Sequence, residues 1–366
     1  NLELNIPDSQ GSFPCVGYGG FWSMDGGSFV QSGAGSVILS LYSSGVATYR
    51  QTAGTASVRQ LGIGWGSNTD QIGEVLVSGG SLEVREMLCV PGFRYAAVQV
   101  AATRTTGSVT IEGDGNMASP VNRFLGSSGK GVTVSLNLNG GTFTTGQIER
   151  HPGTDDSNRL FVNFNGGVLK FTNATNYPFG TVRTMPSRIT VFAGGATLDL
   201  ARTGYFPAFF RKPEGRGVAS IPLPTAPVAS YLITQPPVIT ITDGENGPGY
   251  GASAVCDWDW ATCSYSAPRI TCPGCNYTNP VATFDFGYFN NVHQTVTVPC
   301  VLTDLAPTSG GLVKRGTGTL TMFGGDEPGS NDFGGPLVIE QGQVRLYNNA
   351  LADGQTVVLK GGDLAI

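Results

Sequence analysis

Cysteine thiols are the groups in this chain with the clearest capacity for chemistry, and five of the seven lie within 45 positions. These five are Cys256, Cys263, Cys272, Cys275 and Cys300. Four thiolates can close a structural zinc site, but zinc ribbons usually carry two Cys-x-x-Cys pairs and only Cys272-Pro-Gly-Cys275 is present. We therefore favour disulfides, with Cys256–Cys263 across a hairpin and Cys272–Cys275 across a turn as preferred pairs, while the spacing leaves the connectivity open.

The segment Asp257-Trp-Asp-Trp260 is a second candidate site. On a strand, its two carboxylates would share one face and its two indoles the other, because successive side chains alternate. Indole faces can stack on sugar rings, so Trp258 and Trp260 are candidate glycan contacts. The alternative is a hairpin tip whose acids are simply solvated.

The remaining acids and histidines do not form a recognisable catalytic set. Asp155-Asp156 and Asp326-Glu327 lie in turn-like contexts and do not resemble a glycosidase pair. Neither His151 nor His293 has a nucleophile or metal ligand near it in the sequence. There is no phosphate-binding glycine loop with its lysine and no dinucleotide fingerprint. We predict no catalytic residue, no metal site and no cofactor.

The strands that would position these residues are predicted from a recurring pattern, in which a turn of small residues is followed by alternating strand residues. The turns end at Gly27, Gly54, Gly80, Gly107, Gly141, Gly167 and Gly195. Their intervals are 26 to 28 residues, with one of 34 that we expect to carry a loop. Such a period predicts the stacked coils of a parallel β-solenoid, with a β-sandwich as the alternative.

Residues 203–308 interrupt this pattern. They hold 13 of the 22 prolines and only 9 of the 54 glycines, and all five clustered cysteines. We expect an inserted, disulfide-containing β domain that projects from the rod. The solenoid would then comprise residues 1–202 and 309–366, in roughly ten coils.

Two resemblances support this division. Gly311-Leu-Val-Lys-Arg-Gly-Thr-Gly-Thr-Leu-Thr-Met322, Phe333-Gly-Gly335 and Val338-Ile-Glu-Gln-Gly-Gln-Val-Arg-Leu346 resemble the autotransporter-associated β-strand repeat of bacterial surface proteins, over about a tenth of the chain. The resemblance implies export and display on a cell surface. Residues 232–286 resemble a small β module common in such proteins.

Composition is compatible with this class. Charged residues are 13% of the chain and the formal net charge is −5, with no basic patch that would indicate nucleic acid. We interpret Lys314-Arg315 and Arg211-Lys212 as solvated edge charges. No apolar run reaches the roughly 18 residues of a membrane helix.

We therefore expect a noncatalytic extracellular structural protein of a bacterium, the subunit of a homopolymeric surface filament. An alternating strand, Leu2, Leu4 and Ile6, would pair with Leu364 and Ile366 of another copy, because open solenoid edges pair with other chains. A surface adhesin or carbohydrate-binding passenger is the alternative. A β-helix polysaccharide lyase or hydrolase is a further one. No set of outer-membrane barrel strands follows, so a translocator would have been removed or export would use another route.

Overall fold

The computed structural model describes residues 2–5, 19–32, 37–41, 45–65, 71–90, 106–124, 133–150, 158–172, 177–181, 183–206, 208–224, 236–244, 247–259, 261–262, 264–289, 292–324 and 330–366. These residues form strands, turns and irregular segments, with no helix among them. None of them therefore belongs to a helix that could cross a bilayer. The expected all-β class is confirmed.

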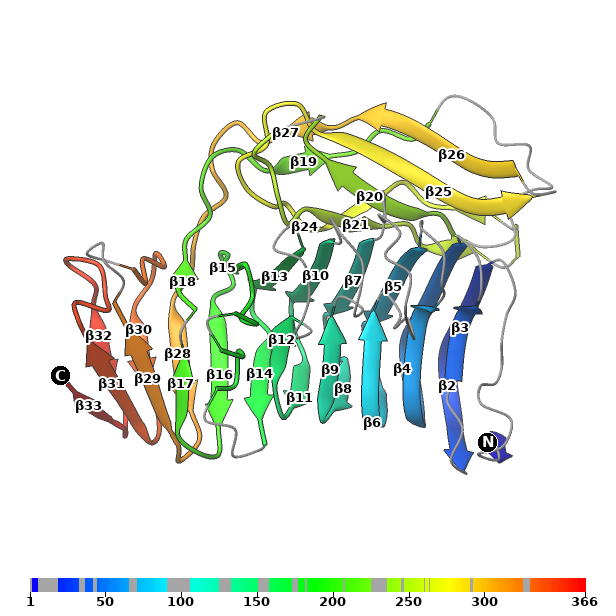
Figure 1. Ribbon diagram of the computed structural model, residues 1–366. Helices are drawn as coiled ribbons and strands as arrows, with labels where there is room; N and C mark the ends of the chain where they lie inside the picture. Colours follow the sequence, from blue (N-terminus) through cyan, green and yellow to red (C-terminus); the bar gives the residue numbers. More distant parts are fainter. Residues whose placement is uncertain are drawn as a thin grey trace.

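Most of the strands stack in parallel as the coils of a solenoid (Figure 1). One coil consists of β10 (Thr133–Leu138), β11 (Thr142–Thr145) and β12 (Ile148–Arg150). In the next coil β13 (Arg159–Phe164) pairs with β10 and β14 (Val168–Phe171) pairs with β11, both in parallel. The stack has about nine turns, against the roughly ten expected, and the parallel pairing excludes the sandwich.

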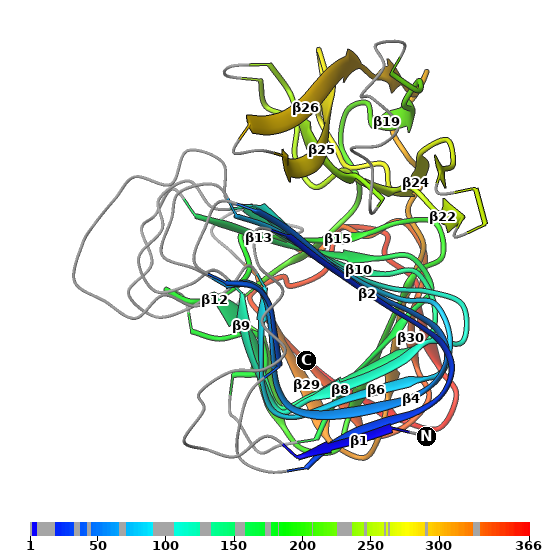
Figure 2. The ribbon, with the colours of Figure 1, turned by 90° about the vertical axis from the view of Figure 1, so that its right-hand side faces the viewer.

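Each coil contributes to walls around the axis, as the end-on view in Figure 2 shows. The wall that we call the docking wall contains the first parts of β2 (Gly19–Ser32) and β4 (Gly45–Trp65), then β5 (Gln71–Val77), β7 (Thr106–Ile111), β10, β13, β15 (Arg188–Val191) and β18 (Phe210–Arg211). The second wall contains β1 (Leu2–Asn5), later parts of β2 and β4, the first part of β6 (Ser81–Val90), β8 (Asn116–Ser119), β11, β14, β16 (Ala196–Leu200), β28 (Leu312–Arg315), β30 (Leu337–Ile339) and β32 (Val357–Leu359). The third contains β3 (Val37–Leu41), the ends of β4 and β6, β9 (Val121–Phe124), β12, β17 (Gly204–Phe206), β29 (Thr319–Phe323), β31 (Gln343–Tyr347) and β33 (Asp363–Ala365).

The core lies inside the coils and follows from the alternation of each strand. Register partners place every second side chain of one coil directly above its equivalent in the next, so apolar residues form rows along the axis. One such row on the docking wall is fully buried: Tyr49, Val75, Val109, Leu136, Val162 and Ile189. Burial of each large apolar side chain contributes about 1.5–3 kcal/mol.

One turn of the predicted period is misplaced. Ser81, Asn116 and Thr142 are register partners, so the turn that precedes β8 is the one at Gly113 and Gly115. Gly107 lies within β7 instead. The long interval therefore falls before β8, and the prediction of a loop between Gly107 and Gly141 is wrong. The error arose because Gly107-Ser-Val-Thr-Ile has the same composition as a turn followed by a strand.

The solenoid continues a little further into the expected insertion than the composition change indicated. β17 pairs with β29 and β18 pairs with β15, both in parallel, so solenoid strands extend to Arg211. The strands that follow pair antiparallel as a separate unit, which we call the module: β19 (Val218–Ser220), β20 (Val238–Thr242), β21 (Ser253–Val255), β22 (Trp258–Asp259), β23 (Ser264–Tyr265), β24 (Arg269–Cys272), β25 (Val281–Phe289), β26 (Val292–Pro299) and β27 (Val301–Leu302).

The module lies along the docking wall and does not project away from the rod (Figures 1 and 2). It has an apolar core of its own, which includes Ile239, Ala282 and Phe284. It also buries part of the solenoid, since Val238 of β20 packs on Val46 and Ile72 of the docking wall. The expectation of a projecting domain is wrong because apolar and polar contacts with the outer face of this wall hold the module against it.

Candidate functional site

The junction between the module and the docking wall gathers the buried charged and polar groups that the solenoid interior excludes. Outward positions of a solenoid strand normally face solvent, yet on this wall Thr48, Glu74, Thr110, Asn137 and Asn163 are all buried. A buried polar group is tolerated when it is hydrogen-bonded. Four of these five side chains are hydrogen-bonded, whereas the Thr48 hydroxyl has no partner among the described residues.

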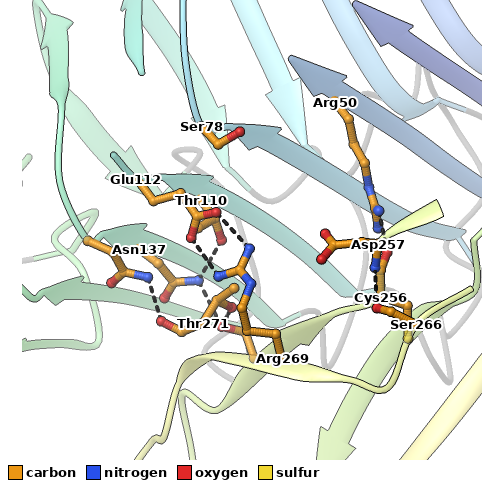
Figure 3. Close-up of polar contacts among 12 residues, drawn as sticks. Arg50, Ser78, Thr110, Glu112, Asn137, Cys256, Asp257, Ser266, Arg269 and Thr271 are labelled. Carbon is orange, nitrogen blue, oxygen red and sulfur yellow. Dashed lines mark hydrogen bonds and ion pairs between the residues drawn. The ribbon is translucent and has the colours of Figure 1, made fainter. Parts of the chain in front are cut away.

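A charged pair lies at one end of the junction, where β4 and β5 face β22 of the module. Arg50 donates from Nε and Nη2 to Glu74 Oε1, at 3.1 and 2.8 Å. Its Nη1 donates to the carbonyl oxygen of Cys256 (Figure 3). Glu74 is only 1% exposed. Burial raises the pKa of Glu74 above its ordinary value, while the Arg50 guanidinium opposes that shift. The pair thus ties two coils and the module together.

A second ion pair closes the middle of the junction. Arg269 of β24 donates through Nη1 and Nη2 to the two carboxylate oxygens of Glu112, at 2.9 and 2.7 Å (Figure 3). Two parallel hydrogen bonds of this kind are among the stronger polar contacts in proteins. The hydrogen bond to Glu112 raises the pKa of Arg269, against the effect of burial. This contact fixes the position of β24 along the rod.

An amide ladder continues the junction across successive coils. Asn163 donates to Asn137 Oδ1 at 2.9 Å, and Asn137 donates to Ser253 Oγ of the module at 2.8 Å. Ser253 in turn bonds Thr271, and Asn139 donates to the Thr271 carbonyl at 2.6 Å. Because Asn137 and Asn163 are register partners, one rung of the ladder serves each coil.

Aromatic contacts form the far end of the junction. Phe161 of the docking wall stacks on Tyr250 of the module, with ring centroids 5.2 Å apart and planes at 20°. The Arg188 guanidinium lies over the Tyr250 ring at 5.3 Å and its Nη2 bonds Glu214 at 3.1 Å. Cation–ring and ring–ring contacts of this kind each contribute about 0.5–1.5 kcal/mol. The module is therefore anchored at both ends and in the middle.

The predicted disulfides are not found among the described cysteines. Cys256, Cys272, Cys275 and Cys300 are free thiols, and Cys263 lies outside the described residues, so only the Cys272–Cys275 pairing can be judged and it is wrong. Tyr250 and Cys275 exchange backbone hydrogen bonds, which hold the end of the Cys272–Cys275 turn against the segment around Tyr250. Burial raises the pKa of Cys256 to about 12 and that of Cys300 to about 11. No group of three His, Cys, Asp or Glu side chains within the described part of the chain could hold a metal ion.

The other predicted site residues are scattered. Trp258 is half-buried on β22, opposite Tyr265 in the expected hairpin, whereas Trp260 lies outside the described residues. Leu2 and Leu4 lie on β1, and Ile6 also lies outside the described residues. Leu364 is half-buried on β33 and Ile366 is 98% exposed. The structure thus brings none of the glycan candidates together with the assembly candidates.

His293 has a partner that its sequence context did not indicate. His293 Nε2 lies 2.7 Å from Asp285 Oδ2 across the β25–β26 hairpin, so this histidine has a buried carboxylate partner. His151 lies outside the described residues. Asp285 also accepts the Gly287 N–H at 2.8 Å, so the contact braces the irregularity of that hairpin.

Lys314 is fully buried, and its interpretation as a solvated charge is wrong. It stands in an inward row between Leu198 and Ile339, and its Nζ donates to the carbonyl oxygens of Arg315, Gly316 and Gln341 at 2.7, 2.8 and 3.1 Å. The first two carbonyls belong to the residues that follow Lys314 in its own coil, and the Gln341 carbonyl belongs to the next coil. Burial lowers the pKa of Lys314 to about 8, against an opposing effect of the Asp199 carboxylate.

Comparisons of the chain with protein-family models, curated proteins and solved structures find no match. The similarity to the autotransporter-associated repeat therefore stays a resemblance, and the solenoid is established by the structure alone.

Proposed function

We propose that this chain is a noncatalytic structural protein of an extracellular bacterial surface, and that its copies join end to end as a filament. The observation that carries the proposal is the apolar end of the stack. Leu359 occupies the same inward row as Leu198 and Ile339, but it is 57% exposed where Ile339 is 0% exposed. An exposed apolar row of this kind is a surface on which a further coil can pack.

We infer that a second copy supplies that coil, and the strand edges at both ends of the described stack could take part in such pairing. Among the described residues β32 and β33 each pair on one side only, with β30 and β31, and β1 pairs only with β2. The two ends lie at opposite extremes of the rod (Figure 1). Unpaired parallel edges of this kind accept a strand, and two unlike ends that fit each other generate an open filament.

The use of the buried charged groups supports a structural role. Arg50 and Glu74 bond each other, Lys314 bonds carbonyl groups, and Asp243 accepts N–H groups of its own module. These charges stabilise the packing of coils and module. Export and surface display are supported by the resemblance of residues 311–346 and by a composition of short, glycine-bounded strands.

Leu359→Lys tests the assembly, with Leu305→Lys as its matched control. Leu305 is 79% exposed in the module segment, so it receives the same charge at a site away from the solenoid end. Sedimentation and electron microscopy should show concentration-dependent fibres for the wild type and Leu305→Lys, and monomers for Leu359→Lys with unchanged circular dichroism. A wild type that stays monomeric at high concentration, or a Leu359→Lys variant that assembles normally, would refute the proposal.

A further inference from the structure

A cleft of about 510 Å³ opens between the docking wall and the module, beside the aromatic contact. Its floor is made by outward residues of successive coils, among them Thr133, Ser135 and Arg159. Its roof is the module loop around Gly244 and Gly249. This volume lies in the range of small-molecule sites, which is roughly 300–1,000 Å³.

The roof is held in place before any ligand binds. Asp243 accepts hydrogen bonds from the backbone N–H groups of Gly249, Thr278 and Asn279, at 3.0, 2.9 and 2.6 Å. Burial would raise the pKa of Asp243, but these hydrogen bonds outweigh it and hold the pKa below its ordinary value. The Asp243 carboxylate is therefore occupied by donors of the module, although it lines the cleft.

Two side chains in the cleft retain unused hydrogen-bonding capacity. Ser135 is 5% exposed, and no residue of the described chain bonds its hydroxyl group. Arg188 also lines the cleft, and its buried Nε has no acceptor among the described residues, although Nη2 is bonded to Glu214. The buried Arg188 Nε costs free energy unless a ligand or water completes it, whereas the Ser135 hydroxyl is not among the buried atoms that lack a partner. Both point to an oxygen-bearing ligand.

The charges of the lining select the sign of that ligand. Arg159 and Arg188 place two guanidinium groups in the lining, while the carboxylate of Asp243 is occupied by N–H groups of the module and that of Glu214 by Arg188. Guanidinium groups match carboxylates in charge and in planar geometry. The lining also offers apolar surface from Ile241 and Phe161 beside its hydroxyl groups. A hydroxylated, carboxylate-bearing molecule satisfies all of these features, whereas a small inorganic anion leaves most of the volume empty.

The cleft extends beyond a single ring-sized space. A narrower cavity of about 100 Å³ follows β20 along the docking wall and shares Thr133, Ser135 and Ala252 with the cleft. We propose that the cleft and this extension bind a short segment of an acidic polysaccharide, with its carboxylate at Arg159 and Arg188 and a hydroxyl group at Ser135. The site is separate from Trp258 and from the end of the rod.

Calorimetric titration of the whole chain with tetragalacturonate tests this assignment. Arg159→Gln and Ser135→Val are the cleft variants. Arg202→Gln is the matched control, since Arg202 is exposed in the turn between β16 and β17. Tetragalacturonate should bind the wild type and Arg202→Gln equally. Arg159→Gln should weaken binding about tenfold, the scale of one charge-assisted hydrogen bond, and Ser135→Val should weaken it by a smaller factor.

Two further titrants distinguish the chemistry. Maltotetraose, a neutral tetrasaccharide, should bind much more weakly than tetragalacturonate, and inorganic sulfate should not compete at equal concentration. The assignment is overturned by absence of tetragalacturonate binding, by equal binding of the neutral sugar, by sulfate binding as tightly as the sugar, or by equal losses in Arg159→Gln and Arg202→Gln. Circular dichroism of Ser135→Val and Arg159→Gln confirms that the module remains folded.

Discussion

Replacing Lys314 with methionine should remove a rise in stability that the wild type gains between pH 8 and pH 10.5. The ammonium group occupies a row whose neighbours are Leu198 and Ile339, and its three acceptors are carbonyl oxygens of turns. Methionine has a similar length and no charge, so it fills the row while it removes the titrating group.

The sign follows from the two pKa values. The folded pKa of Lys314 is about 8 and the ordinary value is 10.5, so burial disfavours the charged form in the folded protein. Below pH 8 both states carry the proton and the full cost of the buried charge is present. Between pH 8 and 10.5 the folded state releases the proton while the unfolded state keeps it, so stability rises with pH. At ~1.36 kcal/mol per pKa unit, the gain is about 3 kcal/mol.

The assay is a comparison of variants, because other groups titrate in the same range. The pKa values of Cys256 and Cys300 are raised to about 12 and 11 in the folded protein. Their contribution to the unfolding free energy therefore falls as pH rises through the range in which the thiols of the unfolded chain ionise. These losses are common to wild type and Lys314→Met and cancel in the difference. Urea unfolding at about pH 7 and pH 10.5 should give a difference in unfolding free energy that shifts by about 3 kcal/mol in favour of the wild type at the higher pH.

Lys360→Met is the control, because Lys360 is exposed and its replacement changes the net charge by the same amount. Its stability relative to the wild type should not depend on pH in this way. A difference between wild type and Lys314→Met that is the same at both pH values would refute the reasoning. A shift of the opposite sign would show that the three carbonyl groups favour the ammonium more than burial disfavours it.

Three other perturbations test the junction and the module. Arg50→Ala should destabilise the chain by about 3–5 kcal/mol in urea unfolding, because it leaves the buried Glu74 carboxylate unpaired. Arg59→Ala breaks a more exposed ion pair and should cost under about 1 kcal/mol. Equal costs for the two variants would contradict this account. Cys272 should resist alkylation in the native chain without reductant and react after unfolding, because it is a buried thiol whose pKa is raised by burial. Mass spectrometry measures both states. Protection that persists in denaturant would indicate a disulfide. Asp243→Asn should lower the unfolding free energy by about 1–3 kcal/mol near neutral pH. This difference should shrink in acid, because the lowered pKa of Asp243 confers stability that is lost as pH falls through that pKa. A difference that does not depend on pH would refute this account.

The solenoid could be predicted because its cause is local. A turn glycine and an alternating strand recur at a nearly constant spacing, and stacked coils are the arrangement that buries every second residue of each strand. Gly54 and Gly80 adopt positive φ at the predicted turns. Gly107 lies inside a strand, but the residues around it resemble a turn followed by a strand, so the same reasoning misplaced a turn there.

The docking of the module could not be predicted from such local patterns. Outward residues of a strand that alternates polar and apolar are expected to face solvent, and nothing near Thr110 or Asn137 in the sequence indicates that another unit covers them. One signal was available. Arg50 and Glu74 are separated by 24 residues, close to one coil, so opposite charges at the solenoid period were candidates for an inter-coil pair. The partner on the module, the Cys256 carbonyl, lies 206 positions from Arg50 and has no signature in the sequence.

Lys314 shows both what the local sequence pattern determines and what depends on contacts between coils. Alternation in β28 places Leu312 and Lys314 on the same face, so once Leu312 is known to be in the core, Lys314 must point inward as well. What the local pattern does not contain is the full set of partners, because the Gln341 carbonyl becomes adjacent only when two coils stack, although Arg315 and Gly316 follow Lys314 directly. The same holds for Ser135, whose strand pattern gives its direction but not the roof that encloses it. In this fold, sequence period determines which way a side chain points. The contacts between coils, and between coils and module, determine whether that side chain serves packing or remains free to bind a ligand.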